Sequence, residues 1–329
     1  RLPFKVEEVE IKVKGVKKPV RGKVYSTIHG PVAKSLGVTD HHQYMLAVRW
    51  TGHELNADIS AIAKLNKARN SSDMIEAAKD FGVLSQNLLY ADSEGNIGWQ
   101  VTGKIPRRIK GNGKYPVPGW DEDYLWAGYL PFDELPALKN PAEGYLATAN
   151  NQTVGDDYPF TISNTWVYPY RIQRILQLLT EKKKLDREDF ERLQGDVYSP
   201  MAAELRSILK DFTSQNPRVN WALKELENWD LSIGADSLPA LLFEVFAWRL
   251  KTHLLALYMG ELKDEYLNSL LPLSVSFGDI LSRTKEENLE AWKNLLHSGR
   301  LYVGNGQEVP ANLFELSWSQ RLTLGGNPV

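Results

Sequence analysis

Residues 86–108 read QNLLYADSEGNIGWQVTGKIPRR and give the clearest structural signal in the chain. Residues 87–91 and 97–102 contain many strand-forming side chains, and they flank Asp-Ser-Glu-Gly, in which Gly95 suits a turn with a positive φ angle. The pattern predicts a β-hairpin. The residues from Asp92 to Asn96 loosely follow the spacing of a calcium-binding loop, but the strands on either side favour the hairpin.

On the N-terminal side of this hairpin, the sequence predicts strands and then helices. Asn56 or Asp58 would cap the first helix, and Ser71 or Ser72 the second, which Gly82 would end. Alternating apolar and polar side chains and strand-forming residues predict three strands before these helices, over residues 6–14, 22–28 and 44–50.

On the C-terminal side, glycine, proline and aromatic residues crowd together over residues 103–165, which predicts long ordered loops with short strands. Apolar residues then recur at a spacing near 3.6, which predicts helices over residues 171–181, 187–193, 200–212, 219–228, 238–262 and 285–296. The chain is therefore expected to be α+β, with a strand-rich part over 1–165 and a mainly helical part over 166–329. These parts need not be independent domains.

The composition excludes several classes of function. The 39 basic and 41 acidic residues give a net charge of −2, so no electrostatic attraction to nucleic acid or membrane surfaces is expected. No apolar run is long enough to span a bilayer. The absence of cysteine removes disulfides and thiol nucleophiles. The chain begins Arg-Leu-Pro-Phe without an initiator methionine, which favours a chain processed or cut from something longer.

Standard catalytic motifs are missing from the sequence. It has no G-x-S-x-G elbow, no H-E-x-x-H helix and no P-loop. His29 could suggest catalysis, but no serine motif accompanies it, and a structural role with its ring bonded to nearby backbone is expected. His41 and His42 are adjacent, so in a strand they would point to opposite sides and could not easily share a metal. Composition and motifs alone therefore predict no active site.

Three segments in order point to a family. YSTIHGPV at 25–32, the stretch 86–108, and PVPGWDEDYLWAGYLPFDELPALKNPAEGYLATANNQ at 116–152 together resemble the β chain of penicillin acylases, which are N-terminal nucleophile hydrolases. Weaker similarity continues through YPYRIQRILQLL at 168–179 and LENWDLSIGADS at 226–237. The resemblance implies part of an αββα sandwich followed by a mostly helical region.

The resemblance also implies a mechanism and a residue for it. A serine at the N-terminus of the β chain attacks the amide carbonyl, and its own α-amino group, with an ordinary pKa of about 8, serves as the base. The negative charge that forms on the carbonyl oxygen is stabilised by the side-chain amide of an asparagine, which corresponds to Asn150 here. Asn151 is expected to bond backbone. Taken alone, two asparagines would more simply form a turn.

Three further residues match positions near the active centre of the family. Arg171 matches an arginine that supports the active centre, although it could equally be a surface arginine in the first turn of a helix. Asn87 matches a residue facing the cleft, and Gln86 a residue of the acyl pocket. A polar side chain at Gln86 argues against assuming a benzyl-type acyl group.

The chain departs from the family in two respects. Arg1 is not a serine, threonine or cysteine, and the stretch it begins matches a region inside the family's β chain. The nucleophilic serine, the upstream β-chain segment and the separate α chain are therefore expected partners outside these residues. The downstream acidic calcium ligand would fall near residues 161–164, where none stands, so no metal or other cofactor is expected in this chain, while calcium stays possible in the parent protein.

The sequence thus predicts a fragment of an amidohydrolase for N-acyl substrates such as a penicillin or an acyl-homoserine lactone, inactive alone. Exposed sheet edges would favour a homodimer, and the resemblance favours a periplasmic or extracellular location. The alternative is a non-catalytic binding or scaffold protein that keeps the fold.

Overall fold

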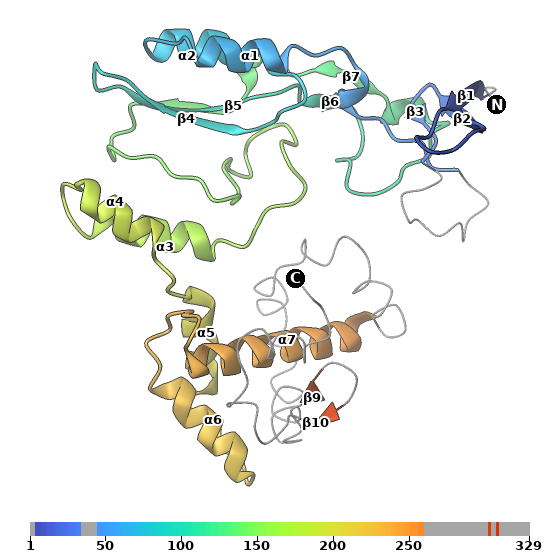
Figure 1. Cartoon of the computed structure of the whole chain (residues 1–329). Coiled ribbons are helices and arrows are strands. Elements are labelled where there is room, and N and C mark those ends of the chain that lie inside the picture. The colour runs from blue at the N-terminus through green and yellow to red at the C-terminus, as the bar shows by residue number, and fades with distance from the viewer. Residues whose placement is uncertain (1–3, 34–44, 260–301, 304–306, 309–329) are drawn as a thin grey trace. The chain divides into compact units, whose positions relative to one another are not determined.

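The computed structural model describes residues 4–33, 45–259, 302–303 and 307–308, and the chain divides into two compact units (Figure 1). The first unit comprises Arg1–Thr148 and Thr153–Asn164. The second comprises Ala149–Gln152 and Thr165–Val329, so a four-residue segment separates from its neighbours in sequence and belongs with the helices.

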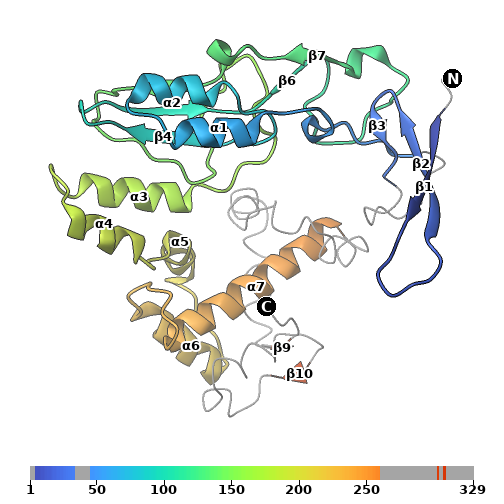
Figure 2. The ribbon, with the colours of Figure 1, turned by 45° about the horizontal axis from the view of Figure 1, so that its top comes forward.

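The first unit is built on the predicted hairpin. Strands β4 (Asn87–Ala91) and β5 (Ile97–Val101) pair antiparallel, and β8 (Ala137–Lys139) adds to β5. Gly95 has a φ angle of 86°, so the turn has the predicted conformation. Helices α1 (Asp58–Leu65) and α2 (Ser71–Ala78) lie along one face of this sheet (Figures 1 and 2). The small buried residues Ala61, Ala77 and Ala78 allow the helices to pack closely.

A second antiparallel sheet contains β1 (Lys5–Ile11), β2 (Val20–Thr27) and β3 (Gly30–Pro31). Glu8 and Glu10 on β1 form ion pairs with Lys23 and Arg21 on β2. The prediction of a strand over residues 44–50 is wrong within the described part of the chain, where only an isolated bridge joins Ala47 to Val32.

Short elements interrupt long loops over residues 103–165, as predicted. Strands β6 (Pro106–Arg108) and β7 (Trp126–Tyr129) pair antiparallel, and a small core gathers Val101, Ile105, Leu130 and Leu135. The described residues of this unit also form the 3-10 helices η1 (Thr51–His53), η2 (Glu122–Tyr124) and η3 (Phe132–Glu134).

The predicted caps of the first two helices are wrong. Asn70 caps α2, since its side chain accepts a hydrogen bond from the backbone N–H of Asp73. Ala57 precedes α1 without a side-chain cap, and Asn56 instead donates to backbone carbonyls. The carboxylate of Asp58 accepts hydrogen bonds from the backbone N–H groups of residues 82–84, so it ties the start of α1 to the loop before β4.

The second unit is helical, as predicted. Its helices are α3 (Tyr170–Thr180), α4 (Arg187–Gln194), α5 (Pro200–Leu209), α6 (Pro217–Glu227) and α7 (Leu238–Met259). Their core includes Leu205, Phe243 and Leu250, all nearly inaccessible to solvent. Two short strands, β9 (Tyr302–Val303) and β10 (Gln307–Glu308), pair with each other. The predicted helix over 285–296, like His41 and His42, lies outside the described residues. The α+β class is confirmed.

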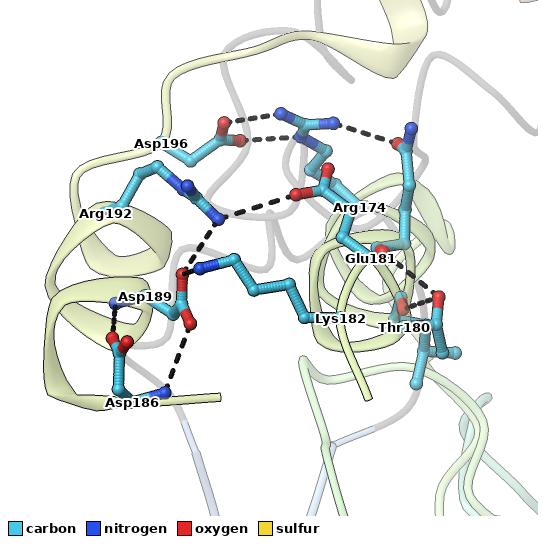
Figure 3. Close-up of polar contacts among 10 residues, drawn as sticks. Arg174, Thr180, Glu181, Lys182, Asp186, Asp189, Arg192 and Asp196 are labelled. Carbon is cyan, nitrogen blue, oxygen red and sulfur yellow. Dashed lines mark hydrogen bonds and ion pairs between the residues drawn. The ribbon is translucent and has the colours of Figure 1, made fainter. Parts of the chain in front are cut away.

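A polar network joins α3 to α4 (Figure 3). Arg174 donates two hydrogen bonds to the carboxylate of Asp196, at 2.7 and 2.9 Å. The side chain of Asp189 is only 4% exposed and accepts from Lys182 and Arg192. Hydrogen bonds from Lys182 and from Arg174 lower the pKa values of Asp189 and Asp196, respectively.

No helix in the described part of the chain is long and apolar enough to cross a membrane.

Candidate active site

Asn150 occupies the short segment that belongs with the helical unit. Its φ angle is +60°, in the left-handed region. An L-residue pays a steric cost there, and asparagine is among the few residue types other than glycine that tolerate it. Its side chain is exposed, while Ala149 before it is buried. The turn therefore presents the Asn150 amide outward from a backbone held in an uncommon conformation.

Arg171 determines which way that amide faces. Its Nη2 donates to the backbone oxygen of Ala149 at 2.9 Å and to Oδ1 of Asn150 at 2.8 Å. A guanidinium can only donate, so the atom of Asn150 that faces it must be the oxygen. The Nδ2 group points elsewhere and makes no hydrogen bond with the described residues. Arg171 thus leaves the two N–H donors of Asn150 available to a ligand.

The position of Arg171 is unusual for a stabilising residue. It is the second residue of α3, where the positive end of the helix dipole disfavours a cation. The carbonyl of Ala149 and the amide oxygen of Asn150 offset that cost by accepting its hydrogen bonds. A cation kept at the unfavourable end of a helix is better explained by what it contacts than by helix stability.

Apolar packing and polar contacts hold α3, the helix that carries Arg171, in place. Ile172 and Leu178 are buried, and Arg174 stacks over Tyr198 at 4.5 Å as well as pairing with Asp196. Tyr170 donates a hydrogen bond to Glu204, and burial together with that bond raises the pKa of Tyr170. The sequence gives no signal for these contacts, because the partners lie more than twenty residues apart on other elements.

Asn151 bonds backbone, as expected. Its Oδ1 accepts from the N–H of Ala149 at 3.0 Å, and its Nδ2 donates to the carbonyl of Gln152 at 2.8 Å. The backbone N–H of Val167 donates to the carbonyl of Asn150 at 2.8 Å. The turn is therefore fixed before, at and after Asn150.

Gln86 and Asn87 lie in the first unit. The Oδ1 of Asn87 accepts a hydrogen bond from the indole N–H of Trp99 at 2.9 Å, which orients this amide as well. The backbone of Gln86 bonds to Thr102, and its side chain is exposed. Their predicted part in substrate binding stays a prediction.

The ring of His29 bonds to backbone, as expected, with Nε2 donating to the carbonyl of Gly119 at 2.6 Å, although that partner lies 90 residues away. Asp92 accepts hydrogen bonds from Asn96 and Glu94 within the hairpin turn. The bonds from Asn96, together with one from the backbone N–H of Ser71, hold the pKa of Asp92 at about 2. In the described ranges, no group of three or more histidine or acidic side chains could hold a metal ion.

Comparison with known proteins gives a consistent picture. A family model described as penicillin amidase matches residues 1–319. The chain is 35% identical over 205 residues to acyl-homoserine lactone acylase QuiP of Pseudomonas aeruginosa, covering 60% of this chain and 24% of that protein. It is 32% identical over 259 residues to QuiP of Pseudomonas fluorescens strain Pf-5, covering 74% and 32%.

Penicillin G acylases are similar as well. The Escherichia coli enzyme is 36% identical over 169 residues, covering 49% of this chain and 19% of that protein. The structure of a thermostable penicillin G acylase from Alcaligenes faecalis matches with a TM-score of 0.63 at 23% identity, covering 80% of this chain and 49% of that chain. The predicted fold is therefore confirmed. The chain spans 24% and 32% of the length of the two QuiP acylases.

Proposed function

Because the chain belongs to the penicillin amidase family, we propose that it supplies the oxyanion-stabilising half of an amidohydrolase active site, with Asn150 as donor. The observation that carries this proposal is the hydrogen bond from Arg171 to Oδ1 of Asn150, which leaves Nδ2 free to donate. Attack on an amide carbonyl moves negative charge onto its oxygen. A neutral N–H already aimed at that oxygen stabilises the charge without burying a counter-ion, and one such donor is worth about 10²–10³ in rate.

The nucleophile of this reaction is proposed to be a serine outside these 329 residues. Support comes from the length of the relatives, of which the chain matches only about a quarter to a third. The serine would attack through its hydroxyl, with its α-amino group as base. On this proposal the chain alone is inactive, and its partners are the upstream segment and a separate α chain of the same precursor.

The proposed substrates are small N-acyl amides. The relatives are named for acyl-homoserine lactones and for penicillins, which share an acyl group joined to nitrogen through an amide. We place the whole protein in the periplasm or outside the cell, and we propose no metal or other cofactor for the reaction. Association of two copies through exposed strand edges also stays a proposal.

The test compares the whole protein with its Asn150→Ala variant, using penicillin G and N-acyl-homoserine lactones as substrates. We expect kcat to fall by about 10²–10³, and no turnover by residues 1–329 alone. Asn228→Ala is a matched control, because Asn228 is an exposed asparagine whose Nδ2 donates to a backbone carbonyl at the end of α6. Unchanged turnover in Asn150→Ala would refute the oxyanion role, and no hydrolysis by the whole protein would favour a binding or scaffold protein.

A further inference from the structure

We infer that Asn151 is a positioning residue, which holds Asn150 in the conformation that presents its amide to the substrate. This inference rests on the proposed oxyanion role of Asn150. Its basis is that the side chain of Asn151 bonds to the backbone on both sides of Asn150, to the N–H of Ala149 and to the carbonyl of Gln152.

The turn at Asn150 is held both by residues distant in sequence and by its neighbour Asn151. Arg171 binds the carbonyl that precedes Asn150, and the N–H of Val167 binds the carbonyl of Asn150 itself, so the two peptide groups that define its φ angle each have one partner. Those partners lie on or near α3, more than fifteen residues away. The side chain of Asn151 is the local restraint, since it closes the turn from within.

The backbone conformation explains why a local restraint is needed. The φ angle of +60° at Asn150 is sterically unfavourable for a residue with a Cβ atom, compared with ordinary backbone conformations. A turn that is strained in this way relaxes when its hydrogen bonds are removed. A change in the backbone angles of Asn150 would alter the direction of its Cα–Cβ bond and so move Nδ2 away from the oxyanion.

Asparagine suits this task at position 151 through both of its amide atoms. The oxygen accepts from the N–H of Ala149, and the NH₂ group donates to Gln152. Alanine would provide neither bond. Aspartate would keep an oxygen acceptor but lose the donor, so it should be impaired less than alanine in holding the turn.

The test is a double-mutant cycle in the whole protein with Asn150→Ala, Asn151→Ala and the double variant. Since a misplacement of about 1 Å can cost about 10²-fold in rate, we expect Asn151→Ala to lower kcat by about tenfold to 10²-fold with little change in KM. If Asn151 acts through Asn150, the double variant should be no slower than Asn150→Ala.

Asn220→Ala is the matched control. Asn220 on α6 also accepts from one backbone N–H and donates to one backbone carbonyl, both of Ser214. Its replacement should lower the melting temperature about as much as Asn151→Ala does, while kcat stays unchanged. If Asn151→Ala fails to fold, Asn151→Asp takes its place in the cycle.

The two proposals fail in different ways. Full kcat in Asn151→Ala beside an impaired Asn150→Ala would overturn the positioning role alone. So would a loss of activity in Asn151→Ala that multiplies fully with that of Asn150→Ala. Full activity in Asn150→Ala would overturn the proposed function itself.

Discussion

Replacing Asn150 by glycine should leave the chain more stable than replacing it by alanine. The φ angle of +60° costs alanine roughly 1–2 kcal/mol, whereas glycine adopts it freely. Glycine loses about 0.4–1 kcal/mol of this advantage, because its unfolded chain has more conformations. The glycine variant should therefore be ahead by roughly 1 kcal/mol. Both variants lose the hydrogen bond to Arg171, so that bond cancels in the comparison.

Urea denaturation of the purified 329-residue chain, followed by circular dichroism, measures this difference without an activity assay. In thermal unfolding of the same chain, a change of 1 kcal/mol corresponds to about 2–4 °C in melting temperature for a unit of this size. Asn220 provides a control of opposite sign, because it lies in helix α6, where alanine is favoured over glycine by about 0.5–1 kcal/mol.

If Asn150→Ala proves more stable than Asn150→Gly, as expected for the two variants at position 220, the left-handed conformation of Asn150 is wrong. The hydrogen bond from Arg171 that orients Nδ2 of Asn150 would then lose its support too, because the position of the Asn150 side chain depends on that backbone conformation.

Two further predictions concern α3. Arg171→Met should lower kcat of the whole protein by at least about tenfold, but by no more than the 10²–10³ expected for loss of the Asn150 donor itself. Arg171→Lys, which keeps the charge without the planar guanidinium, should retain more activity than Arg171→Met. Equal activity of the parent protein, Arg171→Met and Arg171→Lys would count against the proposed orientation of Asn150. The pKa of Asp196 is lowered in the folded chain chiefly by its hydrogen bond from Arg174, so this contribution to stability is present above the unfolded pKa of about 3.9 and is lost as the pH falls through the lower folded value. Urea denaturation of Asp196→Asn should therefore show lower stability at neutral pH and a smaller loss on acidification than the parent chain, and parallel pH profiles would contradict this.

Local sequence patterns predicted the hairpin and the order of elements well, because strand pairs and helices depend on neighbouring residues. The caps show where such patterns stop. Asn70, Ser71 and Ser72 are all good capping residues in a row, and the choice among them depends on where the helix packs. Asp58 also matches a cap, but its carboxylate accepts from backbone N–H groups 24–26 residues further along.

The site was predictable only through resemblance. An Asn-Asn pair by itself favours a turn. Nothing in the sequence indicates that Asn150 and Arg171, which lie 21 residues apart, form a hydrogen bond with each other. The resemblance gave residue identities but no geometry. It contained neither the direction of the Asn150 amide nor the two hydrogen bonds that the Asn151 side chain makes with the backbone. The direction of the Asn150 amide follows from the long-range packing of α3, and the bonds of Asn151 follow from the local turn, neither of which periodicity encodes.

The bond between Arg171 and Asn150 also has a consequence for the order of events during synthesis. Asn150 leaves the ribosome before Arg171, and at about 5–20 residues per second the interval is about one to four seconds. During that interval nothing distinguishes the oxygen side of the Asn150 amide from its nitrogen side. The donor thus acquires its direction only when the first turn of α3 has formed, so the nascent chain completes this part of the site late, from a residue downstream.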